Sequence, residues 1–284
     1  MKTKVSLLYS LRDPAGRNMA SEIGRRLGEQ FNLGDKGIEL ISFEREILYV
    51  KNCEELGVSD FDYIVVLSRH SGTPHRPIFT AHVPGNFGRA RYGGESFKLG
   101  IAIPSLMKEY LIAASKRVGG TGYSVGFEPT HHGPTIDKPL AFLEIGCDEG
   151  AWNDPSGIKI AAESVIEALE NWTTGKYIPA IAFGGPHVND HFTRVEITTE
   201  YAIGHAARKL DAGWVDITMV KQAIERNGEP PQVAIVDNKG LKGEDRERIE
   251  SAIREIGLRE IRVKRLLREG VEAERSQGGQ KKEI

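Results

Sequence analysis

The segment FDYIVVLSRHSG, residues 61–72, decides the fold class of this 284-residue chain. Its first seven residues form a nearly continuous apolar run, which is typical of a strand buried on both faces of a sheet. We expect the strand to end at Leu67, where polar residues begin. Because α/β proteins bind ligands beyond the carboxyl ends of their strands, the polar residues after Leu67 are candidates for a functional site.

Strands and helices alternate on both sides of this segment. Apolar residues at Met19, Ile23, Leu27 and Phe31 recur every four positions, which predicts a helix with one buried face. We expect strands at residues 5–10, 38–43, 47–50, 61–67, 78–83, 123–127, 140–145, 178–183, 201–206, 233–236 and 260–263, and further helices from residue 104 and at 155–172, 218–227 and 244–256. This alternation predicts an α/β fold with three layers, α/β/α, around one central sheet that is mostly parallel or mixed.

The chain is expected to form a single domain over residues 1–269. A chain of this length can bury a large core without disulfides or metals. The Gly-rich and Arg-rich stretch at residues 68–100 is interpreted as an insertion into that domain. Residues 270–284 show no apolar periodicity, and we expect them to be a flexible tail.

The composition is that of an ordinary soluble globular protein, with 39% hydrophobic and 27% charged residues. There are 38 basic and 40 acidic residues, which excludes a wholly basic nucleic-acid binder but allows a local basic patch. We therefore expect no binding to DNA.

The cysteines and the apolar runs exclude other classes. Cys53 and Cys147 lie far apart, which excludes a disulfide framework and a thiolate zinc finger. No apolar run reaches the ~20 residues of a membrane span, and the N-terminus has no signal-peptide pattern. We expect a cytoplasmic protein that does not bind membranes.

Histidines gather just after predicted strands. Six of the eight do so: His70, His75, His131, His132, His187 and His191. Because the carboxyl ends of parallel strands meet at one edge of a sheet, we expect residues 68–71, 128–135 and 184–191 to meet in one pocket.

The residue types near this pocket suit a zinc ion, since imidazole and carboxylate are common zinc ligands. The candidates are His131, His132, Glu144, His187, Asp190 and His191. The spacing does not diagnose a metal site, because HExxH is absent and adjacent histidines do not easily bind one ion. The alternative is a neutral histidine pair that organises a hydrogen-bonded active-site floor.

A serine nucleophile is a further alternative, because Ser68 and His70 lie close together in the sequence. However, GxSxG is absent, and no acid is placed by spacing to orient the histidine. We therefore expect Ser68, Arg69, His70 and Ser71 to bind substrate.

The loop PGNFGRARYGG, residues 84–94, has the composition of a phosphate-binding or nucleotide-binding segment. Glycine allows a close approach of the backbone, arginine binds phosphate, and aromatic rings stack on bases. Asn86, Arg89 and Arg91 are its candidate contacts. The alternative is a solvated, mobile loop.

Five motifs together resemble the D-aminoacyl-tRNA deacylase family of the archaeal and plant type. They are LSRHSGTPHRPIFTAHVPGNFG, GFEPTHHGPT, LAFLEIGCDEGAW, AFGGPHVNDHFT and YAIGHAARK, in this order, and the resemblance spans about residues 1–265. Two segments depart from the family pattern, GGPH at 184–187 where GGGH is usual and GHAARK at 204–209 where GHILPK is usual. Neither departure removes a histidine.

The resemblance implies a phosphorylase/hydrolase-like fold and hydrolysis of the ester between a D-amino acid and the terminal adenosine of tRNA, a proofreading reaction of translation. It implies zinc as cofactor, bound by a set drawn from His82, His132, His187, Glu144 and His191. It also implies His131, His132, His187 and Glu144 as catalytic residues, with Arg89 and Arg91 holding the acceptor end of the tRNA. A monomer is favoured.

Two other functions stay open at this point. A zinc-dependent peptidase or amidase on a related fold would share the histidine and glutamate site without needing a basic loop. A tRNA-binding module without catalysis would use Arg89 and Arg91 equally well. Whether the attacking water is activated by metal or by histidine is also open.

Overall fold

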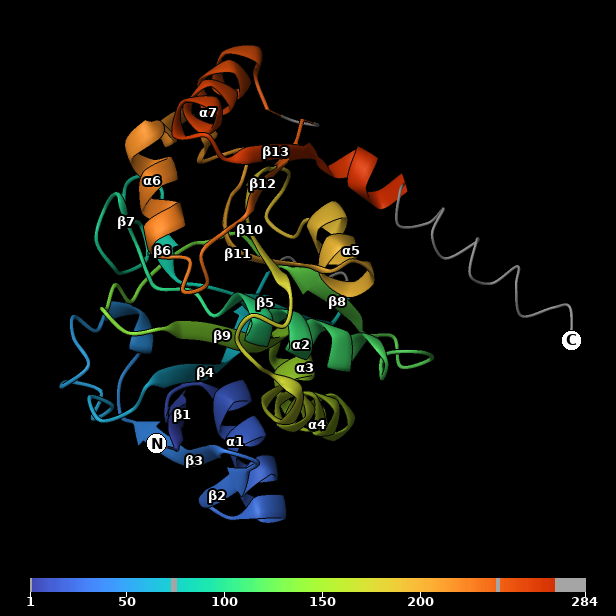
Figure 1. Ribbon diagram of the computed structural model, residues 1–284. Coiled ribbons are helices and arrows are strands. Elements are labelled where there is room, and N and C mark those ends of the chain that lie inside the picture. The colour runs from blue at the N-terminus through green and yellow to red at the C-terminus, as the bar shows by residue number, and fades with distance from the viewer. Residues whose placement is uncertain (1, 73–75, 239–240, 269–284) are drawn as a thin grey trace, which may run out of the picture.

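The structure is a computed structural model, and it describes residues 2–72, 76–238 and 241–268 (Figure 1). Its strands are β1 (Thr3–Ser10), β2 (Gln30–Leu33), β3 (Lys36–Phe43), β4 (Tyr63–Ser71), β5 (Ile78–His82), β6 (Gly85–Asn86), β7 (Lys98–Leu99), β8 (Ser124–Phe127), β9 (Leu140–Cys147), β10 (Ile178–Gly184), β11 (Tyr201–Ala207), β12 (Val233–Asp237) and β13 (Arg259–Arg262). The α-helices are α1 (Pro14–Leu27), α2 (Pro104–Ser115), α3 (Glu149–Asn153), α4 (Pro155–Asn171), α5 (Asp190–Thr198), α6 (Ile217–Glu225) and α7 (Gly243–Ile256), and the 3₁₀ helices are η1 (Ile47–Tyr49) and η2 (Ala212–Trp214). The expected tail at 270–284 and His75 lie outside the described residues.

The strands form a seven-stranded sheet in the order β2-β3-β1-β4-β9-β5-β8 and a four-stranded sheet in the order β11-β10-β12-β13. The large sheet is mixed and is flanked by helices, so the predicted α/β class is confirmed (Figure 1). One central sheet was expected, but the strands from residue 178 onward form a second, all-parallel sheet.

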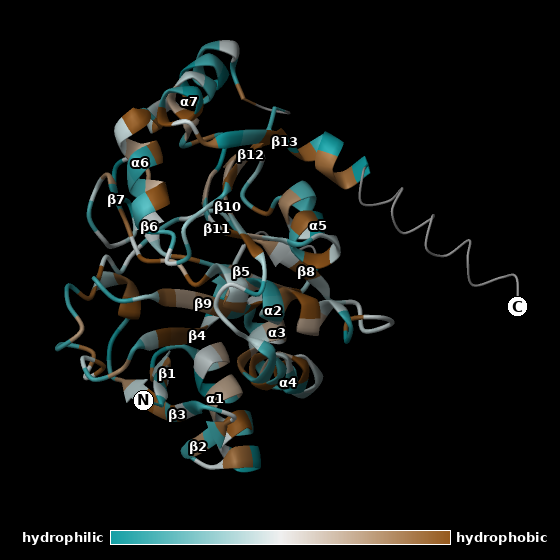
Figure 2. Ribbon diagram, in the orientation of Figure 1, coloured by the Kyte–Doolittle hydropathy of each residue, from teal (hydrophilic) through white to brown (hydrophobic). Residues whose placement is uncertain are grey.

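The large sheet buries both faces because its central strands are apolar at successive positions. Leu7 and Val65 face the helices α1, α2 and α4, whereas Leu8 and Val66 face a layer formed by residues 47–58. Figure 2 shows β4 and β9 as largely hydrophobic strands in the middle of this arrangement. This burial fixes the register of the strands that carry the site, since a slip of one residue would reverse every side chain.

The small sheet lies between two helical layers. Ile181 and Phe183 of β10 pack with α6 and α7, whereas Ala180 and Ala182 pack on the opposite face in the main core with Phe192 of α5. The small sheet and its helices therefore make three layers. Among the described residues, no helix is long and apolar enough to cross a membrane.

Three local expectations were wrong. Helix α1 ends at Leu27, because Gly28 adopts a φ of +86°, and Phe31 therefore lies in β2. Residues 47–49 form the 3₁₀ helix η1 where a strand was expected. Strand β4 continues to Ser71, so residues 68–71 belong to the strand and pair with residues 144–147 of β9.

Strand direction changes inside the large sheet. β4 and β9 are parallel, but β5 runs antiparallel to β9, and β8 runs parallel to β5. The register places Ser68 beside Glu144 and Glu144 beside Thr80. Strands that run in opposite directions therefore deliver polar side chains to one region in the middle of the sheet.

Candidate active site

A cavity of about 480 Å³ opens over this region of the sheet. Its lining includes Ser68–Ser71, Thr130–His132 and His187. The prediction that the three segments meet in one pocket is therefore confirmed. The reason given for it was wrong, because β8 runs opposite to β4 and His187 follows a strand of the second sheet.

Glu128 lies beneath the cavity-lining residues His70, His131 and His187 and is 1% exposed. It follows β8 directly, and its carboxylate faces four imidazoles. Oε1 lies 2.5 Å from Nδ1 of His70, and Oε2 lies 3.3 Å from Nε2 of His187. Oε2 also lies 3.4 Å from Nε2 of His131 and 3.7 Å from Nδ1 of His82.

Burial alone would raise the pKa of Glu128, but contacts with His187 and His70 outweigh it and hold that pKa well below its usual range. The carboxylate is therefore ionised. Neither of its oxygens has a hydrogen bond of good geometry to the described residues. An ionised, buried carboxylate with unsatisfied oxygens is costly unless a ligand or ion completes its contacts.

His70 is held between two carboxylates. Its Nδ1 lies 2.5 Å from Glu128 and 3.6 Å from Oε2 of Glu144. Burial would lower the pKa of His70, but the two carboxylates together outweigh burial and raise the pKa to about 10. His70 is therefore an imidazolium at neutral pH and offsets part of the negative charge on the floor.

Glu144 lines the cavity and is 4% exposed. Thr80 donates a hydrogen bond from its hydroxyl to Oε2 of Glu144 at 3.2 Å. Burial raises the pKa of Glu144 to about 7, and the nearby charge of Glu128 acts in the same direction. A carboxyl group that titrates near neutral pH can either accept or donate a proton during catalysis.

His131 and His132 share an orientation that is common among metal-bound histidines. Nδ1 of His131 lies 2.8 Å from the carbonyl oxygen of Pro129, and Nδ1 of His132 lies 2.6 Å from that of Gly133. A carbonyl oxygen only accepts, so each Nδ1 carries the proton and each Nε2 keeps its lone pair. His132 also adopts a φ of +47°, a strained conformation that is often found at functional sites.

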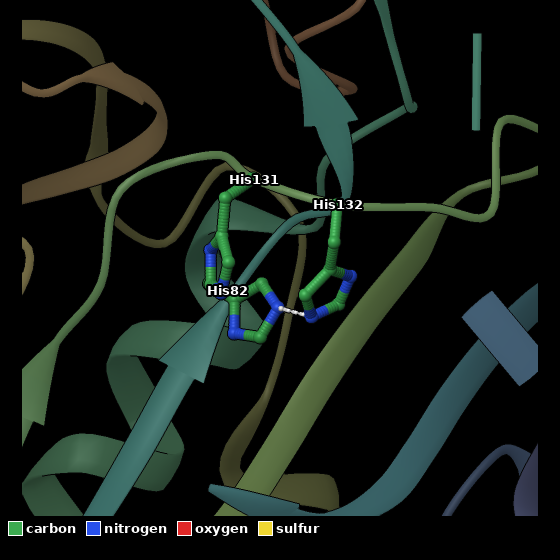
Figure 3. A group of neighbouring side chains, drawn as sticks. All are labelled: His82, His131 and His132. Carbon is green, nitrogen blue, oxygen red and sulfur yellow. Dashed lines mark hydrogen bonds between the residues drawn. The ribbon is translucent and has the colours of Figure 1, made fainter. Parts of the chain in front are cut away.

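His82 completes this group from the end of β5, as Figure 3 shows. Its Nε2 lies 3.1 Å from Nε2 of His132, and its ring stacks on Phe142 with centroids 5.0 Å apart. Nδ1 of His82 is buried and has no hydrogen-bond partner among the described residues. Burial holds the pKa of His82 well below its usual value and lowers that of His132 to about 4, so both rings are neutral.

His187 differs from His131 and His132 in its proton position, because Arg208 contacts its ring. Nη1 of Arg208 donates a hydrogen bond to Nδ1 of His187 at 3.0 Å. A guanidinium has only donors, so Nδ1 accepts, and the proton of the neutral ring must lie on Nε2. That N–H group lies 3.3 Å from Oε2 of Glu128, so His187 presents a proton, whereas His131 and His132 present lone pairs.

Arg89 and Arg91 line the mouth of the pocket and are exposed. No carboxylate pairs with either of them within the described ranges, whereas Arg69 at the same mouth contacts Glu46 at 3.2 Å. The mouth thus offers two unpaired positive charges above an anionic floor. A substrate with phosphate groups outside and a reactive group inside would match this distribution.

Comparison with known proteins identifies the family. A sequence family described as D-aminoacyl-tRNA deacylase matches residues 58–261, most of the chain. The chain belongs to the D-aminoacyl-tRNA deacylase family. The resemblance carried by the five sequence motifs is therefore confirmed.

Two relatives within the family match this chain over nearly their whole length. A D-aminoacyl-tRNA deacylase of Korarchaeum cryptofilum is 67% identical over 269 residues, which cover 95% of this chain and 96% of that protein. A D-aminoacyl-tRNA deacylase of Ignicoccus hospitalis is 36% identical over 260 residues, which cover 90% of this chain and 98% of that protein. A crystal structure described as a conserved protein of unknown function, AF0625, matches with a TM-score of 0.83 and 26% identity. The match covers 93% of this chain and 96% of that chain.

Two residues predicted for the zinc site of this family member lie elsewhere. His191 lies in the first turn of α5 and contacts Oδ2 of Asp237 through Nδ1 at 2.8 Å. It belongs to none of the groups in the described residues that could hold a metal. Asp190 also begins α5 and is exposed. The structure therefore brings neither residue to the floor, because the chain turns into a helix just after His187.

Some of the predicted substrate-binding residues line the pocket, and others hold the surrounding backbone in place. Ser68 donates its hydroxyl to Oδ2 of Asp13 at 3.1 Å, and no histidine contacts that hydroxyl in the described structure. Ser71 is an exposed residue of the pocket lining. Asn86 donates to the carbonyl oxygens of Gly93 and Glu95, both at 3.2 Å, so its amide nitrogen braces the Gly-rich loop.

Sequence reasoning missed Glu128, Asp13 and Arg208. Glu128 could have been found, because it is a carboxylate directly after a buried strand and three residues before the histidine pair. Asp13 caps helix α1 and also accepts from the backbone of Arg69 at 2.9 Å. Arg208 gave no signal, because it lies in the GHAARK segment that departs from the deacylase pattern.

Proposed function

We propose that the chain hydrolyses the ester that joins a D-amino acid to the terminal adenosine of tRNA, releasing the free D-amino acid and tRNA for translation proofreading. The observation that carries this proposal is the ionised Glu128 ringed by histidines beneath a mouth with unpaired arginines. Family membership supports the same substrate class. Since tRNA is used where proteins are made, the proposed location is the cytoplasm.

In the proposed reaction, a water molecule attacks the ester carbonyl, and the bond between the carbonyl carbon and the ribose oxygen breaks. One proton of the water passes to Glu144, whose pKa near 7 leaves part of it ionised at neutral pH. Glu144 then passes this proton to the ribose oxygen, which leaves as a hydroxyl group, while the Nε2–H group of His187 donates a hydrogen bond to that oxygen. His131 and His132 offer their Nε2 lone pairs to the same space, opposite the proton of His187.

The floor fits a zinc ion through the chemistry of its donors. His82, His131 and His132 bring ring nitrogens within 4.8 Å of one another, and Glu128 does the same with His131 and His187. His70, Glu128 and Glu144 form a third such group. Binding of zinc at a set that includes His70 or His187 would displace the proton on that ring, and zinc held there would supply a Lewis acid that polarises the ester carbonyl.

Arg89 and Arg91 are proposed to bind the acceptor end of the tRNA. Both lie at the mouth that the ester must pass, and neither has a carboxylate partner within the described chain. Removing either charge should weaken tRNA binding and flatten its salt dependence, with little effect on stability.

The test compares hydrolysis of D-Tyr-tRNA, L-Tyr-tRNA and a panel of peptides and amides by the purified protein. We expect cleavage of the D-aminoacyl ester, loss of that cleavage on chelation, and recovery when Zn²⁺ is added. Cleavage of peptides or amides in preference to the ester would refute the proposal in favour of a peptidase or amidase. Activity that is unchanged after full metal removal would refute the zinc part alone.

The variant His132→Ala tests for catalysis, with His191→Ala as the matched control. We expect His132→Ala to reduce turnover by about 10²–10⁴-fold while tRNA binding persists, and His191→Ala to retain turnover. If the wild type binds tRNA but never cleaves it, the chain is a binding module. Reaction in H₂¹⁸O with acid quenching should label the D-amino acid and yield no adduct on Ser68 or Ser71; a trapped adduct would refute attack by water.

A further inference from the structure

A second hollow of about 460 Å³ lies beside the mouth of the active site. It is lined by Phe97, Gly213, Trp214, Asp216, Thr218, Met219, Gln222 and Arg248. Trp214 also lies against Gly88, since a Cβ added at Gly88 would come within 2.5 Å of Cδ1 of the indole ring. Gly88 and Arg89 line the active-site cavity, so the two hollows share one wall.

Trp214 and Phe97 form an exposed aromatic pair in this hollow. Trp214 is 46% exposed and Phe97 is 41% exposed, and their ring centroids lie 5.6 Å apart at an angle of 74°. Exposed large aromatics that are held in place indicate a contact surface, because their apolar area is left in water without a partner.

The pair is fixed by its surroundings. Phe97 adopts a φ of +58°, and its carbonyl oxygen accepts a hydrogen bond from Nε2 of Gln222 at 3.1 Å. Oε1 of the same Gln222 accepts from the backbone N–H of Leu99 at 2.6 Å. A strained aromatic residue held from two sides is a preorganised surface, which costs little entropy when a ligand binds.

Arg89, which lines the active-site cavity, also lies close to the aromatic pair. The guanidinium of Arg89 lies 5.9 Å from the centre of the Trp214 ring. Arg89 and Arg91 have no acidic partner among the described residues, although Arg69 and Arg208 are paired with Glu46 and Asp211. A ligand that leaves the cavity therefore meets first a free guanidinium and then a flat aromatic face.

We propose that Trp214, supported by Phe97, stacks on a base of the unpaired 3′ strand of tRNA, next to the terminal adenosine, while Arg89 binds the phosphate between them. The inference rests on the proposed function and adds a subsite to it. A single strand of RNA has this alternation of phosphate and flat base, and aromatic stacking is tolerant of sequence. A peptide would supply no regular anion to match the unpaired guanidinium.

The test uses the full-length enzyme with two substrates, D-aminoacyl-tRNA and D-aminoacyl-adenosine, which lacks the preceding nucleotides. We expect Trp214→Ala to reduce the preference for the tRNA substrate by about 10- to 100-fold, seen in KM, because one stacked base is lost. Trp214→Phe should restore most of that preference. Arg89→Gln should lower it and reduce its salt dependence.

The possible outcomes distinguish a failure of the proposed subsite from a failure of the proposed function. If the wild type cleaves neither substrate, the proposed function fails. If the wild type cleaves both and Trp214→Ala keeps its preference for tRNA, the stacking surface is refuted while the function stands. If Trp214→Ala lowers kcat/KM equally for both substrates, or lowers the melting temperature without recovery in Trp214→Phe, the ring is structural and the proposal is wrong.

Discussion

Replacing Glu128 by glutamine should shift the titration of His70, because Glu128 is the closer of its two carboxylate partners. The pKa of His70 is about 10 against an ordinary value of 6.5. At 1.36 kcal/mol for each pH unit, this difference corresponds to about 5 kcal/mol in favour of the imidazolium. Glu128 approaches Nδ1 to 2.5 Å and Glu144 only to 3.6 Å, so Glu128 supplies the larger share.

We therefore expect the pKa of His70 to fall by about two or more pH units in Glu128→Gln. The matched control is Glu144→Gln, where the fall should be smaller. The measurement is a ¹³C or ¹⁵N imidazole titration by NMR on chelator-treated protein, with His70→Gln used to assign the resonance. If His70 still titrates near 10 without the charge of Glu128, the contacts on the floor have been interpreted wrongly.

The same shift predicts a pH dependence of folding. A histidine whose pKa is raised on folding stabilises the native state below the unfolded value of 6.5, and this contribution is lost as the pH rises through about 10. The wild type should lose stability across that window, and Glu128→Gln should lose less. Deacylation should also fall in this variant by about 10²-fold or more, because the charge that faces His187 is removed.

Two further predictions concern Glu196, which is buried near Lys108, and Arg208, which is half-buried. Burial raises the pKa of Glu196 to about 7, so the native state should lose up to about 3 kcal/mol as the pH rises from about 4.5 to 7. The free energy of unfolding of Glu196→Gln, measured in urea, should not show this loss. An equal dependence on pH in the wild type and the variant would contradict the prediction. Arg208→Met should release the proton of His187 from Nε2, giving mixed tautomers by ¹⁵N NMR and about 10- to 100-fold lower turnover. An unchanged Nε2–H tautomer would show that Arg208 does not set it.

The sequence predicted the fold class because burial leaves a strong signal. The apolar run Ile64–Leu67 and the four-residue spacing of Met19 and Ile23 are consequences of packing, and both elements are present, although Leu27 at the end of the helix is exposed. The spacing could not show that Gly28 ends the helix before Phe31, since a glycine can adopt either positive or negative φ and the sequence does not say which.

The arrangement of the strands could not be predicted in the same way. The apolar pattern of β5 is the same whether it runs parallel or antiparallel to β9. The prediction that His70, His131 and His187 meet was right, although His70 lies within β4 and the rule of a common carboxyl edge does not explain the meeting. The antiparallel step at β5 places Thr80 beside Glu144 and His82 near His132, and this step has no local signature.

The charges of the buried groups explain why the proposed reaction needs a cation in addition to the histidines. Glu128 is ionised and His70 is protonated, so these two nearly cancel. Glu144 adds up to one negative charge near neutral pH, whereas His82 and His132 are neutral because burial lowers their pKa values. The net charge thus lies between zero and about −1, yet negative charge must develop on the ester oxygen as water attacks. The buried groups alone do not stabilise that charge, which supports the proposal that a cation binds among the unsatisfied oxygens of Glu128 and the lone pairs of the histidines.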